Sequence, residues 1–270
     1  MNILQAIFLG IVQGLTEFIP VSSSGHLVLA QHFFGMEAGA DISFEIFMHL
    51  GTLLAVLIFF RMQLWDLLKS LFCWSPKLGG EVHRKNRSII LYLVIATLAT
   101  GLMYILFKDR FEMAYQNPLF VAFMLLITGI MIFSSDFVKN TAVPASNIGV
   151  IKSVIIGLVQ GLAILPGISR SGSTITASLF CNVKRKDAAH FSFLLSIPAI
   201  LAANLKEFNV LMNLDTGVIP QYIAGFIASF ISGYLVIAIL IRLIQGGNLK
   251  YFAYYVWFVG LAAIGYLLLI

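Results

Sequence analysis

The chain has 270 residues, of which 60% are hydrophobic and only 11% are charged. A soluble domain carries about 25% charged residues, so this composition excludes an ordinary soluble protein and indicates one that crosses a membrane several times. The net charge of +5 does not predict a nucleic-acid partner, because basic residues in membrane proteins first mark the loops that stay in the cytoplasm.

The first apolar region covers residues 3–34 and is interrupted by the polar stretch PVSSSG. About ten apolar residues follow the break, and ten helical residues cover about 15 Å, half of a 30 Å hydrocarbon core. The region is therefore predicted to enter the membrane, break and turn back. Because no basic residue precedes Arg61, the charged start of a signal peptide is missing, and we expect this region to stay in the mature protein.

Six further segments are apolar enough to cross a bilayer as plain helices, which takes about 20 residues each. Charged or polar loops separate them, so each is expected to cross once. The segments are 44–60, 88–107, 119–137, 188–205, 219–241 and 251–270. The only two cysteines, Cys73 and Cys181, are too few for a disulfide framework and are expected to be unpaired thiols.

A second broken region, residues 148–180, is interrupted by PGISRSG and copies the first one. At an offset of 147 residues, LGIVQGLTEFIPVSSSGH aligns with IGLVQGLAILPGISRSGS, and FEIFMHLGTLLA aligns with FSFLLSIPAILA without a gap. One offset held over both segments indicates an internal duplication. The identical positions include Gly10, Gln13, Gly14, Leu15, Ser22, Ser24, Gly25, Phe44 and Ala55.

Each copy comprises one re-entrant pair and three spans, an odd number of crossings. The second copy is then expected to start on the opposite face of the membrane, which gives inverted repeats. The fold class predicted is an all-α polytopic membrane protein with inverted-topology repeats. We expect one membrane domain over 1–270, with repeats at 1–138 and 148–270 joined by 139–147.

Basic residues are unevenly shared between the two predicted faces. The loops 61–87, 137–152, 184–186 and 242–250 hold 13 Lys and Arg, and the other face holds three. Since basic loops stay in the cytoplasm, both termini are predicted to lie outside. The loop 36–42, which has no Lys or Arg, should then face outside, and 77–87 should face the cytoplasm.

Both breaks place serine and glycine where a short helix restarts, after Pro20 in one copy and Pro166 in the other. A proline ends a helix, and a restarting helix offers unpaired N–H groups and the positive end of its dipole. Two such ends entering from opposite faces predict an anion site near the midplane. The expected binding residues are Gln13, Ser22, Ser24, Gly25, Ser169, Ser171, Gly172, Ser173 and Thr174. The serines have an alternative role, which is to cap the helices.

The two copies differ at the residues that carry chemistry, since Glu17 aligns with Ile164, His26 with Ser173 and Ser23 with Arg170. Ionisable side chains inside a membrane are costly and are functional candidates by default. The alternatives are a buried structural ion pair between Glu17 and Arg170 and a core role for His26.

Glu45 and His49 lie four residues apart in a predicted span. They are expected to lie next to the site residues and to hold them in position without contacting the substrate.

QGLTEFIPVSSSGH and LPGISRSGSTIT closely resemble the two signature segments of the undecaprenyl-diphosphate phosphatase family, also called bacitracin-resistance proteins, and the resemblance covers essentially the whole chain. It implies hydrolysis of undecaprenyl diphosphate to the monophosphate in the bacterial inner membrane, with a divalent cation such as Mg²⁺ or Ca²⁺. It implies that Glu17 is the essential, metal-binding glutamate, Ser23 the nucleophile, His26 the active-site histidine and Arg170 the phosphate ligand. Gln13 departs from the family, where many members carry a first glutamate.

The chemistry expected from these residues leaves two points open. Ser23 or a bound water could attack the phosphoryl group, and the sequence does not choose between them. A polyprenyl-phosphate or anion transporter would use the same helix ends and Arg170, but it would not need Glu17, Ser23 and His26 together. A homodimer is also left open.

Overall fold

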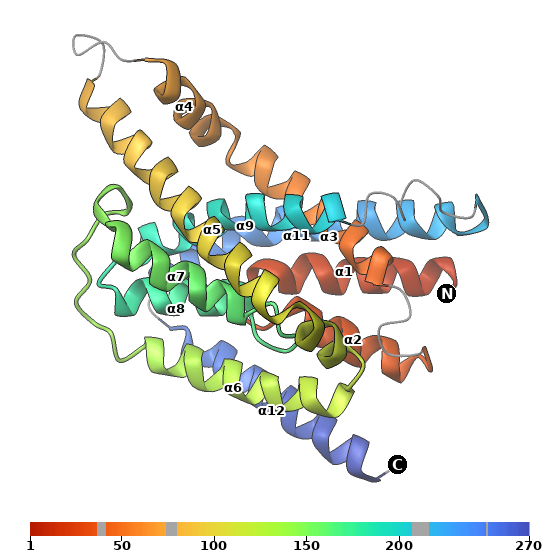
Figure 1. The fold of residues 1–270 in the computed structure, drawn as a ribbon. Helices are drawn as coiled ribbons and strands as arrows, with labels where there is room; N and C mark the ends of the chain where they lie inside the picture. The colour runs from red at the N-terminus through yellow and green to blue at the C-terminus, as the bar shows by residue number, and fades with distance from the viewer. Residues whose placement is uncertain (37–41, 74–79, 207–215, 247, 270) are drawn as a thin grey trace.

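The computed structural model describes residues 1–36, 42–73, 80–206, 216–246 and 248–269. Most of the predicted outside loop 36–42 and the first part of the predicted cytoplasmic loop 77–87 lie outside these residues. The described chain is a bundle of helices, which confirms the all-α class (Figure 1). The helices are α1 (Ile3–Phe18), α2 (Ser23–Phe33), α3 (Ile42–Phe59), α4 (Arg61–Phe72), α5 (Gly80–Tyr115), α6 (Pro118–Ser135), α7 (Val150–Leu162), α8 (Arg170–Phe180), α9 (Arg185–Lys206), α11 (Ile219–Gln245) and α12 (Lys250–Leu269), with short 3-10 turns at Ala145–Asn147 and Thr216–Val218.

The membrane-crossing helices agree with five of the six predicted spans. α5, α6, α9, α11 and α12 are each long and apolar enough to cross a bilayer. The span predicted at 44–60 is α3, and the chain bends by 75° between α3 and α4. The two helices together are long and apolar enough to form a sixth span. The chain is thus a multi-pass membrane protein.

The segment 61–87 was predicted to be a loop, and this prediction is wrong for most of its described residues, which are helical. Arg61 starts α4, and the following helix α5 begins at Gly80 rather than at 88. The two helices form a projecting hairpin (Figure 1), held by the buried Ser70, whose hydroxyl lies 2.9 Å from Nδ1 of His83. The prediction was wrong because it ended each helix where charged residues begin. Charged residues interrupt an apolar run, but they are compatible with a helix.

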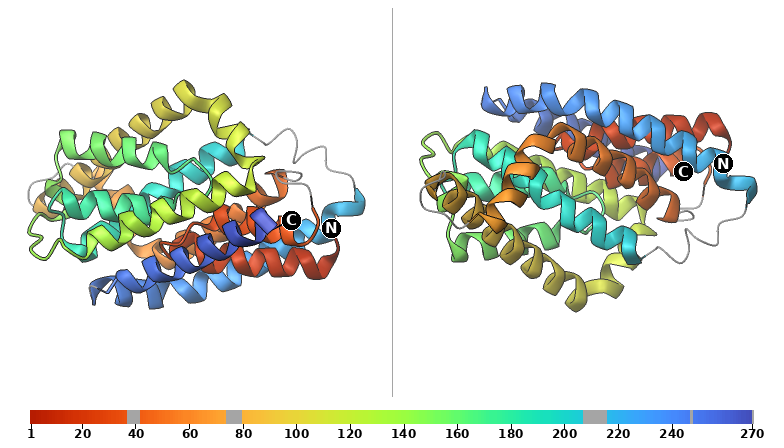
Figure 2. Two further views of the ribbon diagram at one scale, coloured as in Figure 1. Left: turned by 90° about the horizontal axis from the view of Figure 1, so that it is seen from below. Right: turned by 90° about the horizontal axis from the view of Figure 1, so that it is seen from above.

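Both predicted breaks are present, between α1 and α2 and between α7 and α8. α1 and α2 lie at the end of the bundle that carries both termini, and α7 and α8 lie at the opposite end (Figures 1 and 2). The chain restarts at Ser23 in one break and at Arg170 in the other, so the N-terminal ends of α2 and α8 face each other in the middle of the bundle (Figure 1).

Small residues let the broken helices pack closely against helices of the other copy, as is usual in membranes. A Cβ added at Gly14 in α1 would come within 2.0 Å of the Ser232 hydroxyl in α11. A Cβ added at the aligned residue, Gly161 in α7, would come within 2.4 Å of Met103 in α5. Each copy therefore fixes the broken helix of the other.

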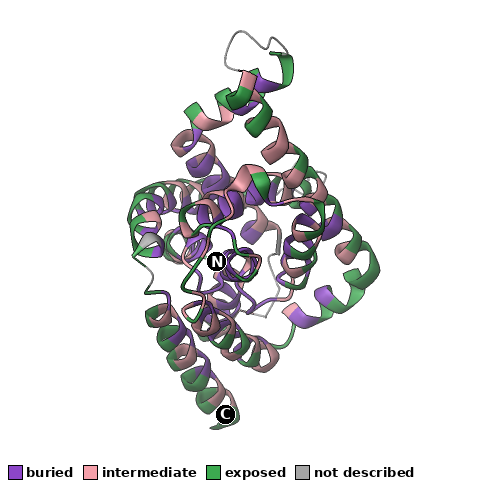
Figure 3. Ribbon diagram, turned by 90° about the vertical axis from the view of Figure 1, so that its left-hand side faces the viewer, coloured by how far each residue is buried: buried purple, intermediate pink, exposed green. Residues whose placement is uncertain are grey.

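Apolar side chains fill much of the core of the bundle and also cover much of its surface, as in a protein surrounded by lipid. Buried segments gather in the middle of the bundle, and exposed ones lie at its periphery (Figure 3). The most enclosed helix is α8, whose residues from Ser171 to Leu179 are all buried. The site residues on α8 are therefore held by packing on every side.

Candidate active site

The Glu17 carboxylate is the centre of the site, and it is buried in the last turn of α1. Pro20 stops the helix just after it, because proline has no N–H to continue the ladder. The guanidinium of Arg170 donates to Glu17 Oε1 at 2.6 Å, and the hydroxyl of Ser23 donates to Oε2 at 2.7 Å. Gln13, one helical turn earlier, donates its amide N–H to the same oxygen at 3.0 Å.

His49 on α3 is the fourth side chain in contact with Glu17, since its Nε2 lies 3.3 Å from Oε2. Its Nδ1 lies 2.7 Å from the backbone carbonyl oxygen of Glu45, so the ring is held at both nitrogens. His49 thus contacts the Glu17 carboxylate directly, and the supporting role predicted for it stays a prediction. Glu45 supplies this carbonyl, and its own side chain is buried.

The capping role predicted as an alternative for the serines applies to one serine in each break. Ser22 accepts the N–H of Gly25 at 3.2 Å, and Ser169 accepts the N–H of Gly172 at 3.0 Å. Ser171 instead donates at 3.2 Å to the carbonyl of Ile19, which follows the last residue of α1 and also accepts the N–H of Val21. These contacts tie the start of α8 to the end of α1.

Arg170 is the first residue of α8, and α9 supports it from the side. Its second guanidinium nitrogen donates to the Ser192 carbonyl at 3.3 Å. The Ser192 hydroxyl lies 2.6 Å from that of Thr174, one turn further along α8. Ser173 is also buried, and its hydroxyl has no hydrogen-bond partner among the described residues. The structural ion pair between Arg170 and Glu17 is formed, so any anion that binds Arg170 has to compete with Glu17.

His26 is set apart from this cluster. Its Nδ1 lies 2.8 Å from the carbonyl oxygen of Ser22, and its Nε2 lies 3.0 Å from the hydroxyl of Tyr255 on α12. The histidine was predicted to act together with Glu17 and Ser23, but both of its ring nitrogens are engaged with other groups.

Three residues of the site were not predicted. Tyr115, the last residue of α5, has a hydroxyl that hydrogen-bonds the side chain of Ser24. It was missed because the charges at 108–110 placed the predicted end of that helix at 107. Ser192 had a signal in the sequence, because it is the residue that the 147 offset aligns with Glu45. Tyr255 had none, because it is 229 residues from His26.

The described residues hold no group of three His, Cys, Asp or Glu that could bind a metal. Mg²⁺ does not need one, since it is commonly held by one or two carboxylates, water and substrate phosphates. Gln13 donates its amide N–H to Glu17, and its buried amide oxygen has no hydrogen-bond partner among the described residues. This orphaned oxygen and the Glu17 carboxylate fit a divalent cation that protein and substrate hold jointly.

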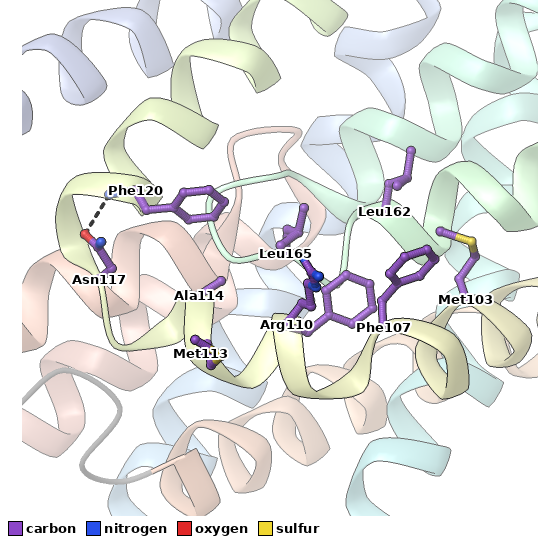
Figure 4. A pocket seen from close by; sticks show the side chains of 10 residues that line it. Met103, Phe107, Arg110, Met113, Ala114, Asn117, Phe120, Leu162 and Leu165 are labelled. Atoms are coloured by element: carbon purple, nitrogen blue, oxygen red, sulfur yellow. Dashed lines mark hydrogen bonds between the residues drawn. The ribbon is translucent and has the colours of Figure 1, made fainter.

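An apolar cavity of about 420 Å³ opens between α5, the start of α6 and the end of α7 (Figure 4). Phe107 and Phe111 line it from α5, Leu165 lines it from the α7–α8 connection, and Arg110 is its one charged lining residue. Leu165 lies four residues before Ser169, the cap of α8. The cavity thus borders the connection that leads to Arg170.

Comparison with known proteins found similarity over almost the whole chain. The family model described as bacitracin resistance protein BacA matches residues 6–262. An undecaprenyl-diphosphatase of Methanobrevibacter smithii is 41% identical over 97% of this chain and 96% of its own. Proteins of the same name from Alkaliphilus metalliredigens (40% identical, 96% of this chain and 97% of its own) and Treponema denticola (41%, 97% and 96%) are similarly close.

Proposed function

The chain belongs to the bacitracin resistance protein BacA family, and we propose that it hydrolyses undecaprenyl diphosphate to undecaprenyl phosphate and inorganic phosphate. Proteins named undecaprenyl-diphosphatase that are about 40% identical over nearly their full length support this activity. The product is the lipid carrier used in cell-wall synthesis, which fits the antibiotic resistance in the family's description.

The observation that carries the proposal is the contact of Ser23, Glu17 and Arg170 between two facing helix ends. A hydroxyl is a weak nucleophile until a base accepts its proton, and the Ser23 hydroxyl already donates to Glu17 at 2.7 Å. Arg170 offers the planar fork that suits a phosphoryl group. The N–H groups that start α2 and α8 add the partial positive charge of two helix dipoles.

The reaction begins when the terminal phosphate of the substrate competes with Glu17 for Arg170. Ser23 then attacks the terminal phosphorus, its proton passes to Glu17, and the bond to the lipid phosphate oxygen breaks. The products of this step are undecaprenyl phosphate and a phosphoseryl group, which water hydrolyses to inorganic phosphate and free Ser23. In the alternative, a water molecule held by Glu17 attacks the phosphorus directly and Ser23 orients it.

Glu17 and the amide oxygen of Gln13 would hold a divalent cation, either Mg²⁺ or Ca²⁺. When bound, the cation neutralises the negative charge of the diphosphate and of the leaving phosphate. Gln13 supplies an oxygen ligand without a charge, so the substrate phosphates would contribute most of the remaining ligands.

The polyprenyl chain of the substrate stays in the lipid while the diphosphate reaches the buried site. We place the protein in the bacterial cell membrane with both termini outside, because the described parts of the basic segments, 61–73, 80–87, 137–152, 184–186 and 242–246, lie toward the end of the bundle opposite to the termini (Figure 1). The facing ends of α2 and α8 support the inverted repeats proposed for 1–138 and 148–270.

Phosphate release in detergent tests this function against transport. Micelles have no two sides, so hydrolysis registers there and transport does not. The purified protein is expected to release inorganic phosphate from undecaprenyl diphosphate when Mg²⁺ or Ca²⁺ is present. No release with either cation, together with sided lipid movement in proteoliposomes, would favour the transporter instead.

A further inference from the structure

The C-terminal helix α12 brings one tyrosine to the start of α2, at a point that the proposed reaction does not use. The Tyr255 hydroxyl lies 3.0 Å from Nε2 of His26. The two rings also stack, with 5.5 Å between their centroids and 5° between their planes. His26 is therefore held by an edge contact and a face contact from a single side chain.

The other ring nitrogen decides the direction of this hydrogen bond. Nδ1 of His26 lies 2.8 Å from the carbonyl oxygen of Ser22, and a carbonyl oxygen can only accept. The hydrogen of a neutral imidazole is then on Nδ1, and Nε2 carries the lone pair. Tyr255 must donate to Nε2, which is the one nitrogen of His26 that can take up a proton.

The position of Tyr255 is unusual for a side chain that only fills space. It is 44% exposed on the outside of the bundle, yet its hydroxyl has a partner within the protein. The partner lies on α2, one turn beyond the capping residue Ser22. The contact thus joins the last helix of the chain to the reactive break.

We propose, on the basis of the function proposed above, that Tyr255 is a positioning residue that acts through His26. It donates to Nε2 of the tautomer that the Ser22 carbonyl fixes, and it keeps Nε2 facing α12 until the substrate arrives. Nε2 of His26 then leaves Tyr255, accepts the proton of the water that hydrolyses the phosphoseryl group and releases this proton to solvent, after which Tyr255 donates to Nε2 again.

Tyr255→Phe tests the role because it keeps the stacked ring and removes the hydroxyl. The loss of one hydrogen bond is expected to lower kcat by about three- to tenfold, with KM unchanged because Tyr255 does not bind substrate. In a His26→Ala background the same substitution should change the residual kcat by less than about twofold, since the pair can no longer interact. The matched control is Tyr254→Phe, whose ring contacts Phe133 and Trp257 instead.

A second measurement does not depend on activity. In protein labelled with ¹⁵N-histidine, His26 should show the Nδ1–H tautomer in both proteins, because Nδ1 faces the Ser22 carbonyl in each. The Nε2 resonance should shift in Tyr255→Phe, where Nε2 loses its donor. An unchanged Nε2 resonance, or an equal loss of kcat with and without His26, would overturn the proposal. Absence of phosphate release by the wild type would overturn the proposed function, while the NMR test of the His26–Tyr255 contact would still stand.

Discussion

The two breaks are built alike, but they contribute different chemical groups to the site. In the first break, Ser22 caps α2 with a φ of 71°, and His26 beside it is only half-buried. In the second, Ser169 caps α8 with an ordinary φ of −69°, and the helix is buried from Ser171 to Leu179. The duplicated scaffold therefore has one strained, more open copy with the reactive groups and one enclosed copy that supplies a single fixed charge.

The difference is sharpest at the residues that meet between the breaks. Glu17 belongs to the first copy and Arg170 to the second, and they are joined at 2.6 Å. The residues aligned with them, Ile164 and Ser23, make no such pair. Each of the following changes compares residues of the two copies, and the last two pairs, Gln13 with Gln160 and Ser22 with Ser169, lie at aligned positions.

The largest effect is expected from Glu17→Gln and Arg170→Gln. Each should lower phosphate release by about 10³-fold or more, since preorganised charge is the main source of catalysis here. Each should also destabilise the protein by about 3–5 kcal/mol, because it leaves one buried charge without its partner. The double variant should regain most of the thermal stability in detergent but none of the activity. Substantial activity in the double variant would reduce the pair to a structural role.

Ser23→Ala compared with Ser171→Ala is expected to give the next largest difference. Ser23→Ala should lower the rate on the order of 10²-fold, because the group that hands its proton to Glu17 is lost. Ser171→Ala removes the hydrogen bond to the Ile19 carbonyl and the contact with the Ser169 hydroxyl, each worth about 0.5–1.5 kcal/mol of stability. Phosphate release and acid-quench trapping of a phosphoseryl group measure the first effect. Equal rates for the two variants would exclude Ser23 from the reaction.

Gln13→Leu and Gln160→Leu separate a cation ligand from a packing residue. The two glutamines are aligned, and each has a buried amide oxygen without a hydrogen-bond partner in the part of the chain that the structure describes, but only Gln13 contacts Glu17. Gln13→Leu should raise the Mg²⁺ concentration for half-maximal activity about tenfold, as is typical when a metal loses a supporting ligand. Gln160→Leu should leave it unchanged. Activity that persists in the wild type after full chelation would remove the cation from the proposal.

The smallest effect concerns the two caps. Ser22→Gly relieves a left-handed conformation that costs about 1–2 kcal/mol in other residues, and a glycine cap loses only a few tenths. Ser22→Gly should therefore raise thermal stability slightly, whereas Ser169→Gly should lower it slightly. Thermal unfolding in detergent measures both. A stability loss in Ser22→Gly equal to that in Ser169→Gly would mean that the φ of Ser22 stores no strain.

Much of this arrangement could be predicted from the sequence because it is local or repeated. The proline after Glu17 and the serine–glycine run placed the first break, and the fixed offset placed the second one. Even the Glu17–Arg170 pair was foreseen as an alternative, since two opposite charges buried in one membrane domain have few other partners.

The contacts that were missed depend on tertiary structure. The charges at 108–110 end the apolar run, although α5 continues to Tyr115. The last turns of α5, and Tyr115 with them, were therefore not predicted as helix. Tyr255 lies on a helix whose pattern shows only apolar residues facing lipid. Its hydrogen bond to His26 depends on how α12 packs against α2, and no sequence pattern near either residue predicts that packing.

The pairing of the two broken helices also fixes when the protein can become active during its synthesis. Glu17 is made 153 residues before Arg170, and at about 5–20 residues per second this interval lasts roughly 8–30 s. Gly14 gains its packing partner Ser232 even later, because α11 is translated after α8. A carboxylate in an isolated apolar helix is costly in lipid, so α1 has to remain near the translocon or the membrane surface until its partners emerge. Maturation of the site is therefore a late event of membrane insertion, and a chain that stalls before α8 would leave Glu17 without its arginine.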